Sequence, residues 1–90
     1  MIASELGVGQ VVFSKAGRDA GLPFVVLGTE ENFVFLSDGK LRPLERPKKK
    51  KIIHIQKTNA VSGELQSMLQ NGNAKNSDII KFIRSFYEGR

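Results

Sequence analysis

Two short apolar runs, separated by a polar stretch with two glycines, constrain the fold of this chain most strongly. Residues 11–13 (VVF) and 24–27 (FVVL) are β-branched, aromatic or aliphatic, a composition that favours strands. Between them, residues 14–21 contain Gly17 and Gly21, which permit positive φ at low steric cost. The pattern predicts a strand, a loop of fixed shape and a second strand.

The segments that follow predict further short strands. We expect five strands, over Gln10 to Lys15, Phe24 to Thr29, Phe33 to Leu36, Lys40 to Leu44 and Ile52 to Gln56. Asp38-Gly39 predicts a type I′ hairpin turn into the fourth strand, and Pro43 marks that strand as an edge. The lysines of residues 48–51 are expected in a charged connection. Short strands with turns every eight to about twelve residues indicate a small barrel or sandwich.

The pattern becomes helical after Lys57. Apolar residues from Val61 to Leu69 recur at helical spacing, Ser62 is placed to cap the helix, and residues 71–73 (NGN) end it. A second helix is expected to begin near Ser77-Asp78, with a hydroxyl cap and an acid in its first turn. Its apolar stripe consists of Ile79, Ile80, Ile83, Phe86 and Tyr87.

These patterns divide the chain into a β part and a helical part. We expect a five-stranded β-barrel domain over residues 1–57 and a helical hairpin, packed on or beside it, over residues 58–90. A short helical turn is expected from Ala3 to Leu6. Since most apolar stripes on helices are core packing, the stripe of the second helix is expected to face the protein interior. The alternative is that this stripe docks on a partner or on a second copy of the chain.

The composition excludes several classes of function. The 90 residues include no cysteine and one histidine, which excludes disulfides and thiolate metal sites, and we expect no metal and no cofactor. His54 has no nucleophile at a recognisable spacing, so we expect no enzyme activity. The longest apolar run, Leu22 to Leu27, is too short to span a bilayer, and residues 1–5 do not resemble a signal peptide. We expect a cytoplasmic protein without a membrane partner.

Positive charge is concentrated in one segment. The chain carries a net charge of +5, but residues 40–57 alone carry +7, and the remainder carries −2. A strongly basic segment on a mildly acidic body is typical of a surface that binds a polyanion. A solvated lysine face that serves only solubility is the alternative, although such lysines are usually interspersed with acids.

The strand–loop–strand segment also resembles a known motif. Gly9–Val12, Gly17–Gly21 and Phe24–Leu27 are similar to the KOW motif, an RNA-binding unit of ribosomal proteins and transcription elongation factors. The likeness continues in the same order over residues 9–57 and is more specifically to the fourteen-e family of archaeal and eukaryotic large-subunit ribosomal proteins. The resemblance implies an SH3-like β-barrel whose loops contact RNA, in translation or ribosome assembly.

The sequence therefore predicts a non-catalytic RNA-binding protein. The expected partner is structured RNA, and the resemblance implies ribosomal RNA with ribosomal proteins as further contacts. We expect the chain to be a monomer. The expected RNA-binding residues are Lys15, Gly17, Arg18, Gly21, Phe24, Lys40, Arg42, Arg46, Lys48, Lys49, Lys50, Lys51, His54 and Lys57. Among the phenylalanines, Phe24 is the one expected to be exposed for base stacking. The alternative is an SH3-like interaction module that binds an acidic protein partner through the same lysines.

Overall fold

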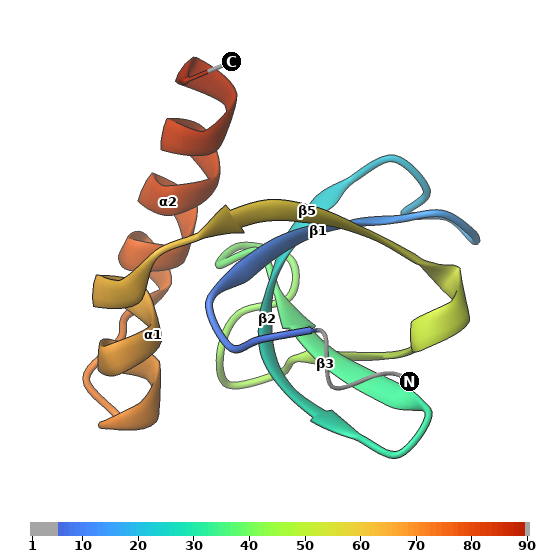
Figure 1. The fold of residues 1–90 in the computed structure, drawn as a ribbon, viewed down its shortest axis with the longest axis horizontal. Coiled ribbons are helices and arrows are strands. Elements are labelled where there is room, and N and C mark those ends of the chain that lie inside the picture. Colours follow the sequence, from blue (N-terminus) through green and yellow to red (C-terminus); the bar gives the residue numbers. More distant parts are fainter. Residues whose placement is uncertain (1–5, 90) are drawn as a thin grey trace.

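The computed structural model describes residues 6–89, which form one five-stranded antiparallel sheet and two α-helices (Figure 1). The elements are β1 (Gln10–Ser14), β2 (Pro23–Glu30), β3 (Phe33–Ser37), β4 (Lys48–Lys51), the 3-10 helix η2 (Ile52–His54), β5 (Ile55–Val61), α1 (Gly63–Gln70) and α2 (Asn76–Glu88). The predicted class, mainly β with a helical tail, is confirmed. The helical turn expected from Ala3 to Leu6 lies almost entirely outside the described residues.

The sheet has the order β4-β3-β2-β1-β5 and is strongly curved (Figure 1). In the pairing of β2 with β3 the register shifts between Val26 and Gly28, and in the pairing of β1 with β5 it shifts between Gln10 and Val12. Such irregularities bend a strand and increase its twist. The curvature brings the edge strand β4 toward the loop between β1 and β2, although β3 lies between β4 and β2 in the sheet order.

Each face of the curved sheet carries its own apolar cluster. The inner cluster is formed by Val12, Phe24, Val26, Val34, Leu36 and Ile55. The outer cluster, formed by Val25, Leu65 and Ile79, joins β2 to α1 and α2, which lie together on one side of the sheet (Figure 1). The outer cluster gives the helices a shared core with the sheet, and β5 itself continues past Lys57 to Val61.

The expected fourth strand over Lys40 to Leu44 is wrong, and so is the type I′ turn before it. Asp38 does not have positive φ, unlike Gly39. The Asp38 carboxylate accepts hydrogen bonds from the backbone N–H groups of Lys40 and Arg42, both at 2.9 Å. Because these contacts use the N–H groups that a ladder would need, the segment forms a loop. The lysines of residues 48–51 form the edge strand instead and pair with residues 33–36 of β3.

The expected strand from Ile52 to Gln56 is also wrong at its start. Residues 52–54 form η2, which turns the chain from one edge of the sheet to the other, and β5 begins at Ile55. The Ile52 N–H donates to the carbonyl of Asn32 at 2.8 Å, and the Ile53 side chain is 72% exposed. The apolar composition of residues 52–54 suggested a strand. These residues connect the two edge strands β4 and β5, so the chain has to turn here.

The first helix begins and ends as predicted, whereas the second has a different cap. The Ser62 hydroxyl accepts a hydrogen bond from the Leu65 N–H at 3.1 Å, and Gly72 adopts positive φ after the end of α1. Helix α2 begins at Asn76 with Lys75 as its cap residue, so the expected hydroxyl cap at Ser77 is wrong. The first-turn acid is present, because the Asp78 carboxylate accepts from the Lys75 N–H at 2.9 Å.

Candidate functional site

The loop between β1 and β2, residues 15–22, which we call the glycine loop, is held in shape by polar contacts within it. Ser14 is buried at the end of β1, and its hydroxyl donates to the Asp19 carboxylate at 2.7 Å. The Ser14 carbonyl accepts from the Gly21 N–H at 2.7 Å. Gly17 and Gly21 both have positive φ, a conformation that glycine adopts at low steric cost. Lys15 and Arg18 are exposed on this loop, as predicted.

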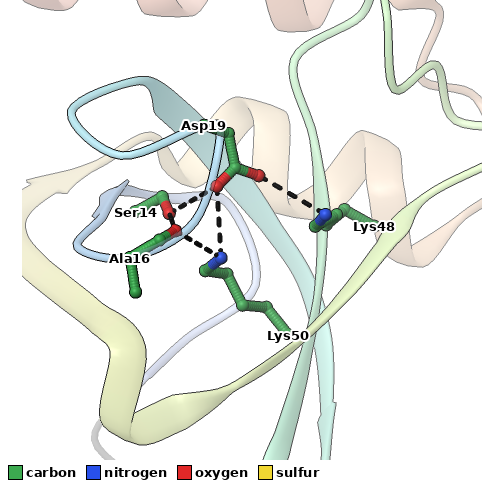
Figure 2. A network of polar contacts seen from close by, with 5 residues as sticks. All are labelled: Ser14, Ala16, Asp19, Lys48 and Lys50. Atoms are coloured by element: carbon green, nitrogen blue, oxygen red, sulfur yellow. Dashed lines mark hydrogen bonds and ion pairs between the residues drawn. The ribbon is translucent and has the colours of Figure 1, made fainter.

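Two lysines of β4 reach this loop and form ion pairs with Asp19 (Figure 2). The amine of Lys50 lies 3.1 Å from Asp19 Oδ1 and donates to the Ala16 carbonyl at 2.9 Å, and the amine of Lys48 lies 3.6 Å from Asp19 Oδ2. In the ladder, Lys48 pairs with Leu36 and Lys50 pairs with a buried valine. Directly paired residues share a face, so these lysines lie on the inner face of the sheet, and only 10% of the Lys50 side chain is exposed.

The environment of Asp19 keeps its carboxyl group ionised. Partial burial raises the pKa, but hydrogen bonds from Ser14 and Lys50, together with the charges of Lys50 and Lys48, outweigh burial and lower the pKa below its ordinary value of 3.8. Asp19 therefore neutralises charge that the sequence assigns to the basic surface. Lys48 and Lys50 therefore hold the loop in place, whether or not they also contact a ligand.

The basic loop between β3 and β4, residues 38–47, is anchored at both ends. Near its start, the Ser37 hydroxyl donates to the Arg42 carbonyl at 2.8 Å. Farther along, the Asn76 amide of α2 accepts from the Leu44 N–H at 2.8 Å and donates to the Glu45 carboxylate at 3.1 Å. The hydrogen bond from Asn76 lowers the pKa of Glu45. Helix α2 thereby positions the segment that carries Arg42.

The two loops face each other across a hollow of about 280 Å³, which we call the loop hollow. Its lining residues are Arg18, Asp19, Leu22, Phe24, Asp38, Leu41, Arg42 and Lys48. Three cations from separate parts of the chain converge here, namely Arg18, Arg42 and Lys48. Arginine can bind phosphate or carboxylate through two parallel hydrogen bonds, and lysine acts as a point charge. The hollow therefore offers both cationic donors and apolar surface to a ligand.

The remaining predicted site residues lie around this hollow or on other faces. Lys40 and Arg46 are exposed on the basic loop. The His54 carbonyl accepts from the Lys15 N–H at 2.8 Å, which places η2 beside the start of the glycine loop. Lys57 lies on β5 opposite Val12, away from the basic loop in the sheet order.

Lys49 and Lys51 lie on the outer face of β4, on the opposite side from Lys48 and Lys50. The amine of Lys49 stands 4.6 Å from the centre of the Phe33 ring and 3.9 Å from the Glu30 carboxylate. Lys51 lines a separate hollow beside Phe33. The structure therefore divides the lysine run between two surfaces.

The expectation that Phe24 is exposed for stacking is wrong. Phe24 is 2% exposed and belongs to the inner cluster. It pairs with Val12 in the ladder, so its side chain shares the inner face with that residue. The strand begins next to the loop, but its second residue already points into the core because side chains alternate between faces.

The sequence reasoning missed three residues of this site. Leu22 and Leu41 supply apolar surface to the loop hollow and are 46% and 81% exposed. Asn76 anchors the basic loop from a helix that is distant in sequence. Leu41 could have been identified from the sequence, because it stands in a basic segment without the apolar periodicity that would predict its burial. Nothing in the local sequence indicates the role of Asn76.

Comparison with known proteins does not assign this site. No protein-family model matches the chain, and no curated protein matches it significantly. Among residues 6–89, no three histidine, aspartate or glutamate side chains are grouped so that they could hold a metal ion. Within the same residues, no helix has the length and apolar character needed to cross a membrane.

Proposed function

We propose that this chain is a non-catalytic RNA-binding protein whose curved sheet is an SH3-like barrel of the KOW type. The observation that carries the proposal is the convergence of Arg18 and Arg42 on one hollow from loops that are distant in sequence. Asp19, the nearest carboxylate of the glycine loop, is already paired with Lys48 and Lys50. The two arginines are therefore available to an external ligand, and a polyanion can satisfy both at once.

Structured RNA suits this surface better than duplex DNA. Loops that project from a small sheet fit irregular RNA surfaces, whereas neither helix is placed to enter a major groove with a row of basic residues. The resemblance over residues 9–57 favours ribosomal RNA and a role in translation or ribosome assembly. Lys15, Lys40 and Arg46 are exposed on the two loops and extend the positive surface beyond the hollow.

Salt dependence and a paired set of variants test the proposal. Fluorescence anisotropy with a labelled ribosomal RNA hairpin should give a log–log slope of affinity against salt of about −3.5 to −4.5, as expected for about five phosphate contacts. The double variant Arg18→Ala/Arg42→Ala should bind about tenfold or more weakly and reduce the slope by about 1.4 to 1.8.

The matched control is Lys75→Ala/Lys81→Ala, which removes the same charge from exposed positions at the start and middle of α2. This control should bind with nearly the affinity of the wild-type chain. Affinity for RNA that is independent of salt, or equal losses in the two double variants, would contradict the proposal. The variants deliberately retain Lys50, because its removal would disturb the loop as well as the charge.

A further inference from the structure

We infer that the chain recognises unpaired RNA in a groove that runs from the glycine loop to helix α2. The inference rests on the proposed function and adds two elements to it, the conformation of the RNA and a contact from the helical tail. It explains why apolar side chains are exposed among the cations of this surface. Neither element follows from a basic patch alone.

The groove consists of the loop hollow and a second hollow beside it. The second hollow, of about 240 Å³, is lined by Leu22, Pro23, Asp38, Lys40, Ile80, Ile83 and Arg84. Because Leu22 and Asp38 line both hollows, the two are adjacent. The apolar side chains of α2 form one wall of the second hollow, and Arg84 places a cation there.

The charges along the groove favour a chain of phosphates. Five cations and two carboxylates line the two hollows together. Asp19 is paired with lysines, and Asp38 Oδ1 accepts two backbone N–H groups. Within residues 6–89, Arg18, Lys40, Arg42 and Arg84 form no ion pair with a carboxylate. These four cations are distributed along both hollows, as contacts to successive phosphates require.

The apolar part of the groove distinguishes unpaired nucleotides from a duplex. A duplex presents phosphates and sugars outward and keeps its base faces stacked inside, whereas bases of loops and bulges can leave the stack and bury their faces on a protein. Leu41 is 81% exposed although its loop is held on either side by the Asp38 hydrogen bonds. A base packed on Leu41 and Leu22 would bury apolar surface that a duplex cannot cover.

The test compares a hairpin that contains an internal loop of unpaired nucleotides with a fully paired hairpin of the same length. The wild-type chain should bind the looped RNA about tenfold more tightly than the paired RNA, which corresponds to about one base-packing contact that the paired RNA cannot make. Leu41→Ala should lower affinity for the looped RNA about fivefold and leave affinity for the paired RNA nearly unchanged. Arg84→Ala should weaken binding of the looped RNA and reduce the salt slope by about 0.7.

Two control variants carry the same chemistry outside the groove. Ile53→Ala removes another highly exposed apolar side chain, and Lys81→Ala removes a cation three residues before Arg84 that lines a different hollow. Both should bind the two RNAs as the wild-type chain does. Retained affinity for the paired RNA also shows that the Leu41 variant is folded.

The outcomes separate this inference from the proposed function. Equal affinity of the wild-type chain for the two RNAs, or equal effects of Leu41→Ala and Ile53→Ala, overturns the groove and leaves RNA binding in place. The absence of binding to either RNA overturns the proposed function itself. A labelled acidic peptide is the third probe, and tighter binding of that peptide than of RNA, lost in Leu41→Ala, would assign the groove to a protein partner instead.

Discussion

Lys50 extends from the edge strand β4 to Asp19 in the loop between β1 and β2, where its amine lies 3.1 Å from the carboxylate. The two residues are 31 positions apart, and in the sheet order β3 lies between β4 and β2, the nearer strand that the loop joins. The amine also binds the Ala16 carbonyl. One side chain therefore fixes the glycine loop against the far edge of the sheet, which is a structural role for a residue that charge alone assigns to ligand binding.

Replacing Lys50 should destabilise the fold, whereas replacing its neighbour should not. Lys50→Met removes the nearer of the two lysine partners of Asp19 and the amine that donates to the Ala16 carbonyl, so we expect a loss of about 1 to 3 kcal/mol in the free energy of unfolding. Lys51→Met, on the exposed face of the same strand, should change it by no more than about 0.5 kcal/mol. Urea unfolding followed by circular dichroism measures both, and equal effects would show that the ion pair does not stabilise the loop.

Acid should remove the contribution of Asp19. Because its folded-state pKa lies below the ordinary value of 3.8, the unfolded chain takes up a proton at higher pH than the folded chain does. The stabilisation is therefore complete above about pH 5 and is lost as pH falls through 3.8 toward the folded pKa. In urea unfolding at a series of pH values, Asp19→Asn should be less stable than the wild-type chain near neutral pH.

The difference between the two proteins should shrink as the pH falls below about 4. The asparagine variant keeps the size of the side chain and its place beside Ser14, so the comparison isolates the charge. A difference in unfolding free energy that stays constant over this range would mean that the Asp19 carboxylate does not titrate with the fold.

The sequence predicts the β1–β2 unit well because its information is local. Alternating and β-branched residues define the strands, glycines define the loop, and β2 and β3 are joined by a short polar turn. The errors begin where the outcome depends on competition between distant groups. Residues 40–44 have a strand-like composition, but the side chains of Asp38 and Asn76 accept hydrogen bonds from their backbone N–H groups. The lysines of residues 48–51 pair with β3 in their place.

The candidate site shows the same division between local and distant information. The glycine loop and the basic loop were both identified, because glycine spacing and net charge are visible in the sequence. That Lys48 and Lys50 pair with Asp19, while Lys49 lies on the opposite face, depends on strand register and on the curvature of the sheet. The part played by Arg84 and Asn76 depends on where α2 docks, which no local pattern specifies.

The caps of the two helices provide a paired prediction. Ser62→Ala removes the side-chain acceptor of the Leu65 N–H and should lower the free energy of unfolding by about 1 kcal/mol. Ser77→Ala changes an exposed residue within the first turn of α2 that caps nothing, and should change stability by no more than about 0.5 kcal/mol. Thermal unfolding of both variants measures the difference, and a larger loss at Ser77 would place the helix start elsewhere.

Gly39 is the point at which the basic loop touches α2, and its replacement should affect both stability and binding. A Cβ atom at this position would lie 2.6 Å from the carbonyl oxygen of Asn76 and 2.9 Å from the Ile80 side chain, and the residue has a φ of +79°. Because the nearest obstacle is helix backbone, the loop or the helix must move. Gly39→Ala should therefore cost about 3 kcal/mol of unfolding free energy, from overpacking and left-handed strain together.

Gly72→Ala is the control that separates the two causes. Gly72 has nearly the same φ of +75°, but nothing lies within 4 Å of the position of its Cβ atom, so alanine there should cost only the backbone term of about 1 to 2 kcal/mol. If the contact with α2 positions Arg42 and Leu41, Gly39→Ala should also weaken RNA binding under conditions in which the variant remains folded, whereas Gly72→Ala should not. Equal losses of stability in the two variants would show that the loop is not packed against the helix, and the groove that depends on this packing would lose its second wall.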